Sequence, residues 1–88
     1  MKIVINARFG GFGLSDAANA AYKARTGVDF DYGLRTDPHL VAIVEEMGAE
    51  ASGACAGLKV VEIPDDVEWF IEEYDGLEHI AEEHRTWG

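Results

Sequence analysis

The chain of 88 residues predicts a single small domain, residues 1–88, and its 48% hydrophobic and 10% aromatic content is typical of a folded protein. One cysteine excludes an internal disulfide and no segment approaches membrane-spanning length, so we expect a cytoplasmic protein. The net charge of −10 argues against generic nucleic-acid binding, because neutralising phosphates requires an excess of Lys and Arg.

The N-terminal third predicts a strand, a glycine-rich turn and a helix. Residues 2–7 (KIVINA) form a short, apolar, β-branched run that is typical of a buried central strand. Glycines then occupy three of the four positions 10–13, which breaks regular structure and permits positive φ angles. Ser15 suits the N-cap of an alanine-rich helix over residues 16–25, and Gly27 suits a C-terminal stop after Thr26.

The middle of the chain predicts a second helix. Residues 28–36 have no clear period and leave room for a short extended piece. Asp37 followed by Pro38 is a helix-start signal, and apolar side chains recur at i, i+3, i+4 and i+7 from Leu40. Because Gly48 weakens a helix without necessarily ending it, we place the stop at Gly53 and the helix at residues 38–52.

The C-terminal part predicts three strands. Residues 58–63 and 67–74 have strand patterns, and Asp75-Gly76 is a strong signal for a two-residue hairpin turn. Pairing Tyr74 with Leu77 would then place Ile71 opposite Ile80. Residues 77–87 also fit a helical face, but we favour the strand. The predicted fold is α+β, a small mixed or antiparallel sheet with two helices on one face, in the order β-α-α-β-β-β.

The turn after the first strand is a candidate anion site. Glycines let the backbone approach an anion, and the following helix N-terminus adds partial positive charge. The arginines could form bidentate forks to phosphate, and the phenylalanines could stack on a base. The candidate ligand-binding residues are Arg8, Phe9, Gly10, Gly11, Phe12, Gly13, Ser15, Arg25 and Arg35.

A plain structural role for the same turn stays open. The GGFG pattern matches neither the dinucleotide fingerprint nor the P-loop. Glycine is common in any tight strand-to-helix turn, with Ser15 then only a helix cap. In that case one phenylalanine is buried and the other is a surface aromatic at a subunit interface. The arginines would pair with the many surface carboxylates instead of a ligand.

The negative charge lies almost entirely in the C-terminal part. Residues 1–40 carry a net charge of +1, and residues 41–88 carry −11. The acidic stretch can form a solvated sheet face and protected edge, a metal or acid–base site, or a mimic of DNA phosphates that occupies a DNA-binding protein. We favour the solvated face.

No motif predicts catalysis or a resident metal. The histidines His39, His79 and His84 do not have zinc-ligand spacing, and Cys55 has no base near it in the sequence. We therefore expect an inert thiol, no cofactor and no metal site, and we expect a binding protein rather than an enzyme.

Three stretches resemble a group of short proteins encoded by tailed phages and prophages: MKIVIN-ARFGGFGLS at 1–15, DPHLVAIVEEMG at 37–48 and LKVVEIPDDVEWFIEEYDGLEHIAEEHRTW at 58–87. The segment EIPDDVEW-x-IEEYDG is the distinctive one. The resemblance implies a phage protein acting in the bacterial cytoplasm, where small proteins often counter host defence. One such class sequesters nucleotide-derived immune signals as homo-oligomers, with pockets between subunits.

Two functional hypotheses follow. The first is a non-enzymatic sponge, a homo-oligomer that binds a small phosphorylated or nucleotide-like signalling molecule at the Gly10–Ser15 turn. The alternative is an acidic protein–protein inhibitor or DNA mimic whose C-terminal half contacts a basic host protein. A small core gains stability from self-association, which is consistent with an oligomer under either hypothesis.

Overall fold

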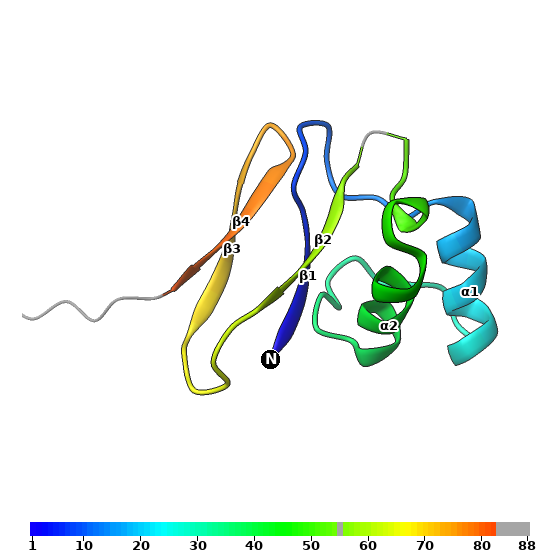
Figure 1. The fold of residues 1–88 in the computed structure, drawn as a ribbon, viewed down its shortest axis with the longest axis horizontal. Helices are drawn as coiled ribbons and strands as arrows, with labels where there is room; N and C mark the ends of the chain where they lie inside the picture. Colours follow the sequence, from blue (N-terminus) through cyan, green and yellow to red (C-terminus); the bar gives the residue numbers. More distant parts are fainter. Residues whose placement is uncertain (55, 83–88) are drawn as a thin grey trace, which may run out of the picture.

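The protein has the predicted α+β class and the predicted order of elements. The computed structural model describes residues 1–54 and 56–82. Its elements are β1 (Lys2–Asn6), α1 (Asp16–Thr26), α2 (Pro38–Met47), the 3-10 turn η1 (Gly48–Ala51), β2 (Leu58–Glu62), β3 (Trp69–Tyr74) and β4 (Leu77–Glu82). Strands β1 and β2 lie between the helices and the β3–β4 hairpin (Figure 1).

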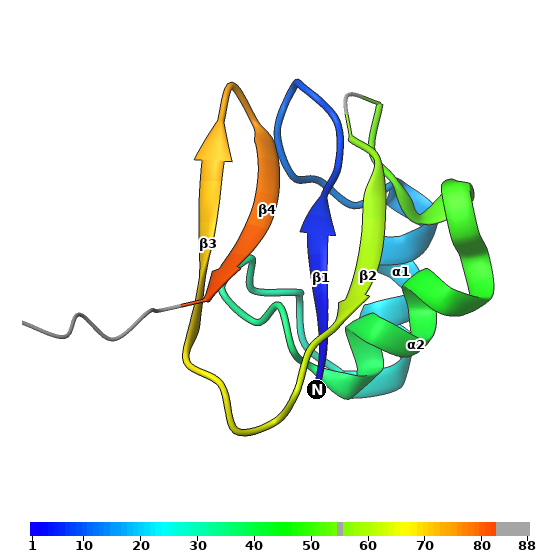
Figure 2. The same cartoon turned by 60° about the vertical axis from the view of Figure 1, so that its left-hand side comes forward.

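The strands form two antiparallel pairs instead of one continuous sheet. β1 pairs with β2, with Ile3 opposite Val61, and β3 pairs with β4. Figure 2 shows the four strands across the molecule in the order β3, β4, β1, β2. Among residues 1–54 and 56–82, no backbone ladder joins β4 to β1. The expected single sheet is therefore split at its centre.

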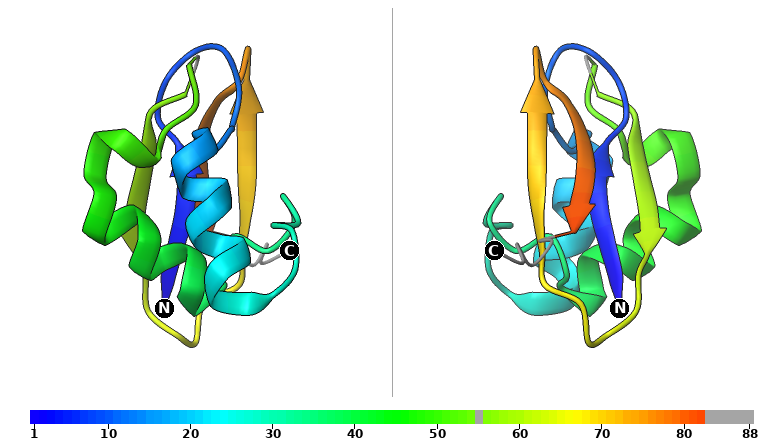
Figure 3. Two further views of the ribbon diagram at one scale, coloured as in Figure 1. Left: turned by 90° about the vertical axis from the view of Figure 1, so that its right-hand side faces the viewer. Right: turned by 90° about the vertical axis from the view of Figure 1, so that its left-hand side faces the viewer.

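Both helices lie on the same side of the β1–β2 pair (Figure 3). Val4 of β1, Leu40 and Ile43 of α2, and Tyr22 of α1 belong to one buried cluster. Each such side chain contributes about 1.5–3 kcal/mol on burial. The predicted apolar stripe of the second helix is thus the face that closes the core.

The predicted helix caps are confirmed, but the end of the second helix was wrong. The Ser15 side chain accepts a hydrogen bond from the backbone N–H of Ala18, and Gly27 has a left-handed φ of 79°. The Asp37 side chain caps α2. This helix ends at Met47 instead of residue 52, because Gly48 takes φ 58° and ψ −131°, outside the helical region.

The hairpin register is confirmed in full. Tyr74 pairs with Leu77 and Ile71 with Ile80. The strand preference for residues 77–87 holds over Leu77–Glu82, while Cys55 and residues 83–87 lie outside the described part. In the structure, each of the strands predicted at 2–7, 58–63 and 67–74 is one or two residues shorter than predicted. Residues 28–36 contain turns and no strand, so the short extended piece for which the sequence left room is not formed.

The hairpin turn packs directly on the glycine-rich turn. Asp75 and Gly76 both have positive φ, as a two-residue hairpin requires. A Cβ placed on Gly76 would overlap the backbone N of Gly11 and lie 2.8 Å from the carbonyl carbon of Gly10. Two glycine-containing turns can therefore approach backbone to backbone at this point.

We predict that Gly76→Ala destabilises the protein by at least about 1 kcal/mol, because it combines positive φ with a backbone clash. Urea unfolding followed by circular dichroism measures the change. Gly33→Ala is the matched control, since Gly33 has no positive φ and a Cβ there meets only the Asp31 carboxylate, at 3.4 Å. Equal stability of the Gly76→Ala and control proteins would contradict the close packing.

A side-chain hydrogen bond joins the two helices. The Tyr22 hydroxyl donates to the Asp37 carboxylate, which also accepts the backbone N–H of His39. Burial acts to raise the pKa of Asp37, but the hydrogen bonds from Tyr22 and His39 outweigh it and hold that pKa below its usual range. The ionised cap is therefore favoured in the folded protein.

We predict that this hydrogen bond adds stability that is present above about pH 4 and is lost as the pH falls through the lowered pKa of Asp37. Tyr22→Phe should destabilise by about 1.5–3 kcal/mol at pH 7, and the difference from the wild type should narrow in acid. Urea unfolding between pH 2 and 7 measures both effects. Tyr32→Phe, which alters an exposed tyrosine, should keep the wild-type profile; a pH-independent loss in Tyr22→Phe would refute the linkage.

Candidate functional site

The glycine-rich turn is occupied by the protein's own hairpin. Gly10 and Gly11 have φ values of 121° and 102°. The backbone N–H of Gly10 donates to the carbonyl of Asp75 at 3.0 Å. One of the N–H groups that would face an anion is therefore used within the fold.

The end of the turn is also tied into the fold. Ser15 accepts from Ala18 N–H at 3.1 Å and donates through its hydroxyl to the carbonyl of Glu50 at 2.6 Å. The carbonyl of Gly13 accepts the N–H of Gly53 at 2.8 Å. These contacts connect the turn to η1 and give Ser15 the capping role that the sequence also allowed.

Arg35 lies in an internal ion pair. Its guanidinium donates from Nη1 to Oε1 of Glu78 at 2.7 Å and from Nη2 to Oε2 at 3.1 Å. The Arg35 side chain is 14% exposed and the Glu78 side chain 8%. Nε donates to the carbonyl of Tyr32, and the guanidinium carbon lies 3.7 Å from the centre of the Phe12 ring. The Arg35 fork was predicted to bind phosphate; in the structure it pairs with the protein's own carboxylate, as the plain structural interpretation allowed.

The same ion pair explains the split between the two strand pairs. The backbone N–H groups of Val4 and Asn6 face β4, and neither donates to a β4 carbonyl. Val4 donates to the carbonyl of Arg35, and Asn6 donates to Oε1 of Glu78. A loop carbonyl and a carboxylate thus take the place of the missing ladder.

The Asn6 side chain completes this arrangement. It is fully buried, and its amide donates to the carbonyls of Arg8 and Gly76 while its oxygen accepts the N–H of Gly57. A single asparagine therefore holds three chain segments together. The sequence showed it only as the last polar residue of an apolar strand.

The other candidate arginines separate from one another. Arg25 forms two hydrogen bonds to Glu46 across the helices, at 2.7 and 3.0 Å. Arg8 is exposed, with its aliphatic stem against Gly57. Only Arg8 remains as an exposed cation at the turn among the three candidate arginines.

The two phenylalanines of the turn also separate, as the plain structural interpretation expected. Phe12 is half-buried among Arg35, Phe30 and Tyr32. Phe9 is 61% exposed. Of the aromatic pair, Phe9 alone is free to meet a ligand or partner.

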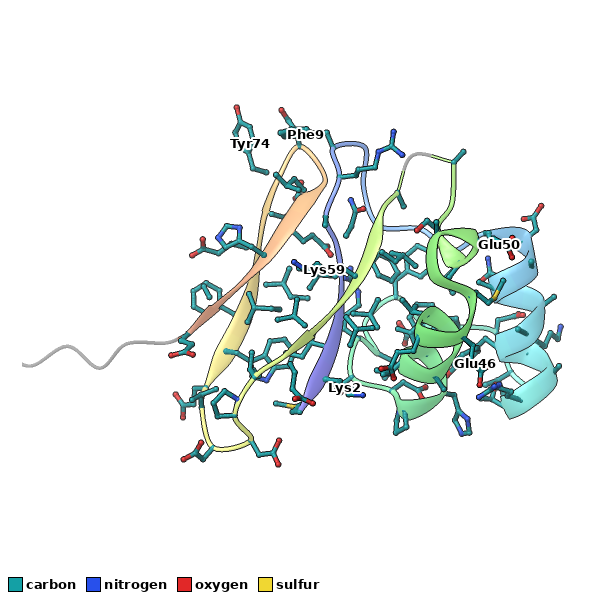
Figure 4. All side chains as sticks on the ribbon, viewed as in Figure 1. Lys2, Phe9, Glu46, Glu50, Lys59 and Tyr74 are labelled. Carbon is teal, nitrogen blue, oxygen red and sulfur yellow. The ribbon has the colours of Figure 1, made fainter. Side chains whose placement is uncertain are left out.

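The exposed face of the hairpin gathers a set of residues that the sequence analysis did not single out. Phe70 and Tyr74 of β3 are 46% and 71% exposed, with Glu72 between them on the same strand face. Figure 4 shows Tyr74 at the same end of the molecule as Phe9. The residue after Phe9, Gly10, donates its backbone N–H to the carbonyl of Asp75, the residue after Tyr74. The alternation of apolar and acidic residues over 67–74 was the available signal, because it places Phe70 on the same strand face as Glu68 and Glu72.

The chain segment that contains the hairpin is strongly acidic. Residues 62–82 contain nine Asp and Glu residues and no Lys or Arg. Glu78 is buried by Arg35, and Glu72 contacts His79 at 2.7 Å. We name the surface formed by Phe70, Glu72 and Tyr74 the hairpin face.

Among the described residues, one hollow lies away from the predicted site residues. An open groove of about 420 Å³ lies between the start of β1 and α2, where Val41 and Ala42 line it and Lys2 pairs with Glu45 at 3.0 Å. Within the described ranges, no group of three His, Cys, Asp or Glu side chains could hold a metal ion. The helices in those ranges are too short or too polar to span a membrane.

No protein-family model matches the chain, and comparison with curated proteins and with solved structures found no match.

We predict that breaking the buried pair through Arg35→Met or Glu78→Leu destabilises the protein by about 3–5 kcal/mol, since each leaves an uncompensated buried charge. The double variant Arg35→Met/Glu78→Leu should be more stable than either single variant. Arg25→Met removes an exposed pair and should cost about 0–1 kcal/mol. Chemical unfolding of the four proteins measures these differences; additive losses in the double variant would show that the pair is not coupled.

Proposed function

We propose that the protein is a non-enzymatic binding module that contacts a basic protein through the hairpin face. The observation that carries this proposal is the exposure of two large aromatic side chains, Phe70 and Tyr74, within a chain segment, residues 62–82, that contains nine acidic residues and no Lys or Arg. Buried aromatic anchors supply much of the affinity of protein interfaces. Complementary charge around them increases the association rate and selects the partner.

The arrangement favours a protein partner over simple mimicry of DNA. A phosphate mimic needs regularly placed carboxylates, whereas here Phe70, Glu72 and Tyr74 alternate along one strand face. The aromatic side chains add apolar contact area that a DNA backbone does not offer. A partner with basic residues around apolar pockets fits this surface best.

The phage resemblance gives this activity a biological setting. A small acidic protein that binds a basic host protein could act as an inhibitor in counter-defence within the bacterial cytoplasm. Self-association remains a prediction based on the small core.

The test begins with the full chain immobilised and exposed to bacterial extract, followed by titration of the recovered protein in purified form. We predict that Phe70→Ser and Tyr74→Ser each weaken binding at least tenfold, as expected for interface hot spots. Glu72→Lys should weaken binding and reduce its dependence on salt.

Val28→Ser is the matched control, because Val28 is 58% exposed but lies in the loop after α1. It should bind as the wild type does. A partner that binds equally well to the Phe70→Ser, Tyr74→Ser and control proteins would refute the hairpin face as the site.

Binding of a phosphorylated ligand at the glycine-rich turn is the second candidate. Its specific support is the exposed Arg8 beside two glycines of positive φ. Arg25 and Arg35 are engaged elsewhere, which weakens it. Calorimetric titration with cyclic and linear nucleotides tests it: binding lost in Arg8→Ala would support this candidate, and absence of binding would exclude it.

A further inference from the structure

The outer edge of β3 is an unpaired strand edge with a defined set of backbone groups. β3 pairs with β4 on one side only, and Figure 2 shows no described element on its other side. The two-residue turn makes Tyr74 and Leu77 a hydrogen-bonded pair, and such pairs alternate along an antiparallel ladder. The backbone groups of Phe70, Glu72 and Tyr74 therefore face β4.

The intervening residues, Trp69, Ile71 and Glu73, direct their backbone N–H and C=O groups outward. Within residues 1–54 and 56–82, no backbone hydrogen bond outside the β3–β4 ladder involves these three positions. An unpaired edge of this kind is a template for an added strand. The six residues of β3 contain no Pro, Lys or Gly that would interrupt it.

The two faces of this edge differ in chemistry. One face carries Phe70, Glu72 and Tyr74, and the other carries the half-buried Trp69 and Ile71. Side chains of an added strand alternate between these faces. Basic side chains would lie beside Glu72 and the aromatic rings, and apolar side chains would extend the inner face.

The negative charge decides between a foreign strand and a second copy. If β3 paired antiparallel with β3 of another copy through these outward groups and centred on Glu72, the two Glu72 side chains would lie directly opposite one another and the two Glu73 side chains would be diagonal neighbours. Like charges in such cross-strand positions are destabilising. A strand with basic side chains would instead place opposite charges in these cross-strand positions, which is stabilising.

We infer that the partner of the hairpin face binds by adding an extended segment of alternating basic and apolar residues to the free edge of β3. This inference rests on the proposed function and specifies its binding mode. The N–H and C=O groups of Trp69, Ile71 and Glu73 form the new ladder, and the side chains on the two faces select the sequence.

The probe is a capped eight-residue peptide of alternating lysine and valine, titrated calorimetrically against the full chain. Glu73→Pro removes an outward N–H without touching the β3–β4 ladder, a position where an edge strand tolerates proline. Its matched control is Glu73→Ala, which removes the same charge and keeps the N–H. We expect Glu73→Pro to bind the peptide about fivefold or more weakly than Glu73→Ala.

Amide hydrogen exchange of the wild type provides a second measurement that needs no variant. On peptide binding, the amides of Trp69, Ile71 and Glu73 should gain protection, whereas those of Phe70 and Glu72 are already protected by β4. A peptide with its four lysines and four valines in separate blocks should bind more weakly.

The outcomes separate the two proposals. Peptide binding that depends on Phe70 and Tyr74 but is equal in Glu73→Pro and Glu73→Ala, with no new protection on β3, would overturn strand addition and leave the hairpin face as a binding surface. Failure of every basic peptide and protein to bind would overturn both. A dimer by sedimentation that dissociates in Glu73→Pro but not in Glu73→Ala would make a second copy the occupant and would overturn the inference.

Discussion

The buried contact between Arg35 and Glu78 is the interaction on which the architecture depends. One edge of β1 pairs with β2, and its other edge presents the N–H groups of Val4 and Asn6 toward the hairpin. A backbone donor buried without a partner costs about 1–3 kcal/mol, so both must be satisfied. The Arg35 carbonyl and the Glu78 carboxylate satisfy them while the two side chains neutralise each other. The hairpin is thereby held against β1 by side chains instead of a ladder.

This arrangement has consequences at the turn of the hairpin and at the outer edge of β3. At the turn, Asp75 and Gly76 pack on the glycine-rich segment, which uses the conformational freedom of its glycines for contact within the fold. Arg35, a candidate for phosphate binding, becomes a structural cation covered by Phe12. At the opposite edge, β3 stays unpaired because β4 lies between it and β1. The same geometry that occupies much of the candidate anion site exposes the hairpin face.

The uneven charge of the chain has a spatial counterpart. Of the three candidate arginines, two contact carboxylates within the fold, Arg25 with Glu46 and Arg35 with Glu78. Most acidic residues of the hairpin and the segment before it are exposed. The molecule thus presents an acidic surface with aromatic side chains in it, a combination suited to recognition of a basic protein. The negative charge also opposes pairing between identical β3 edges, which would otherwise favour aggregation.

Local patterns by themselves determined much of this protein. Ser15, Gly27 and the Asp37-Pro38 pair predicted where helices begin or end, and Asp75-Gly76 predicted the hairpin with its register, because caps and two-residue turns depend on residues adjacent in the chain. The sequence analysis placed the end of the second helix too late. A glycine can adopt helical or non-helical backbone angles, and the residues next to Gly48 do not determine which. Only the tertiary structure decided that Arg35 meets Glu78, that Asn6 bridges three segments and that the glycine-rich turn receives the hairpin. The Asn6–Gly76 contact joins residues 70 positions apart, and no local propensity encodes such a pairing.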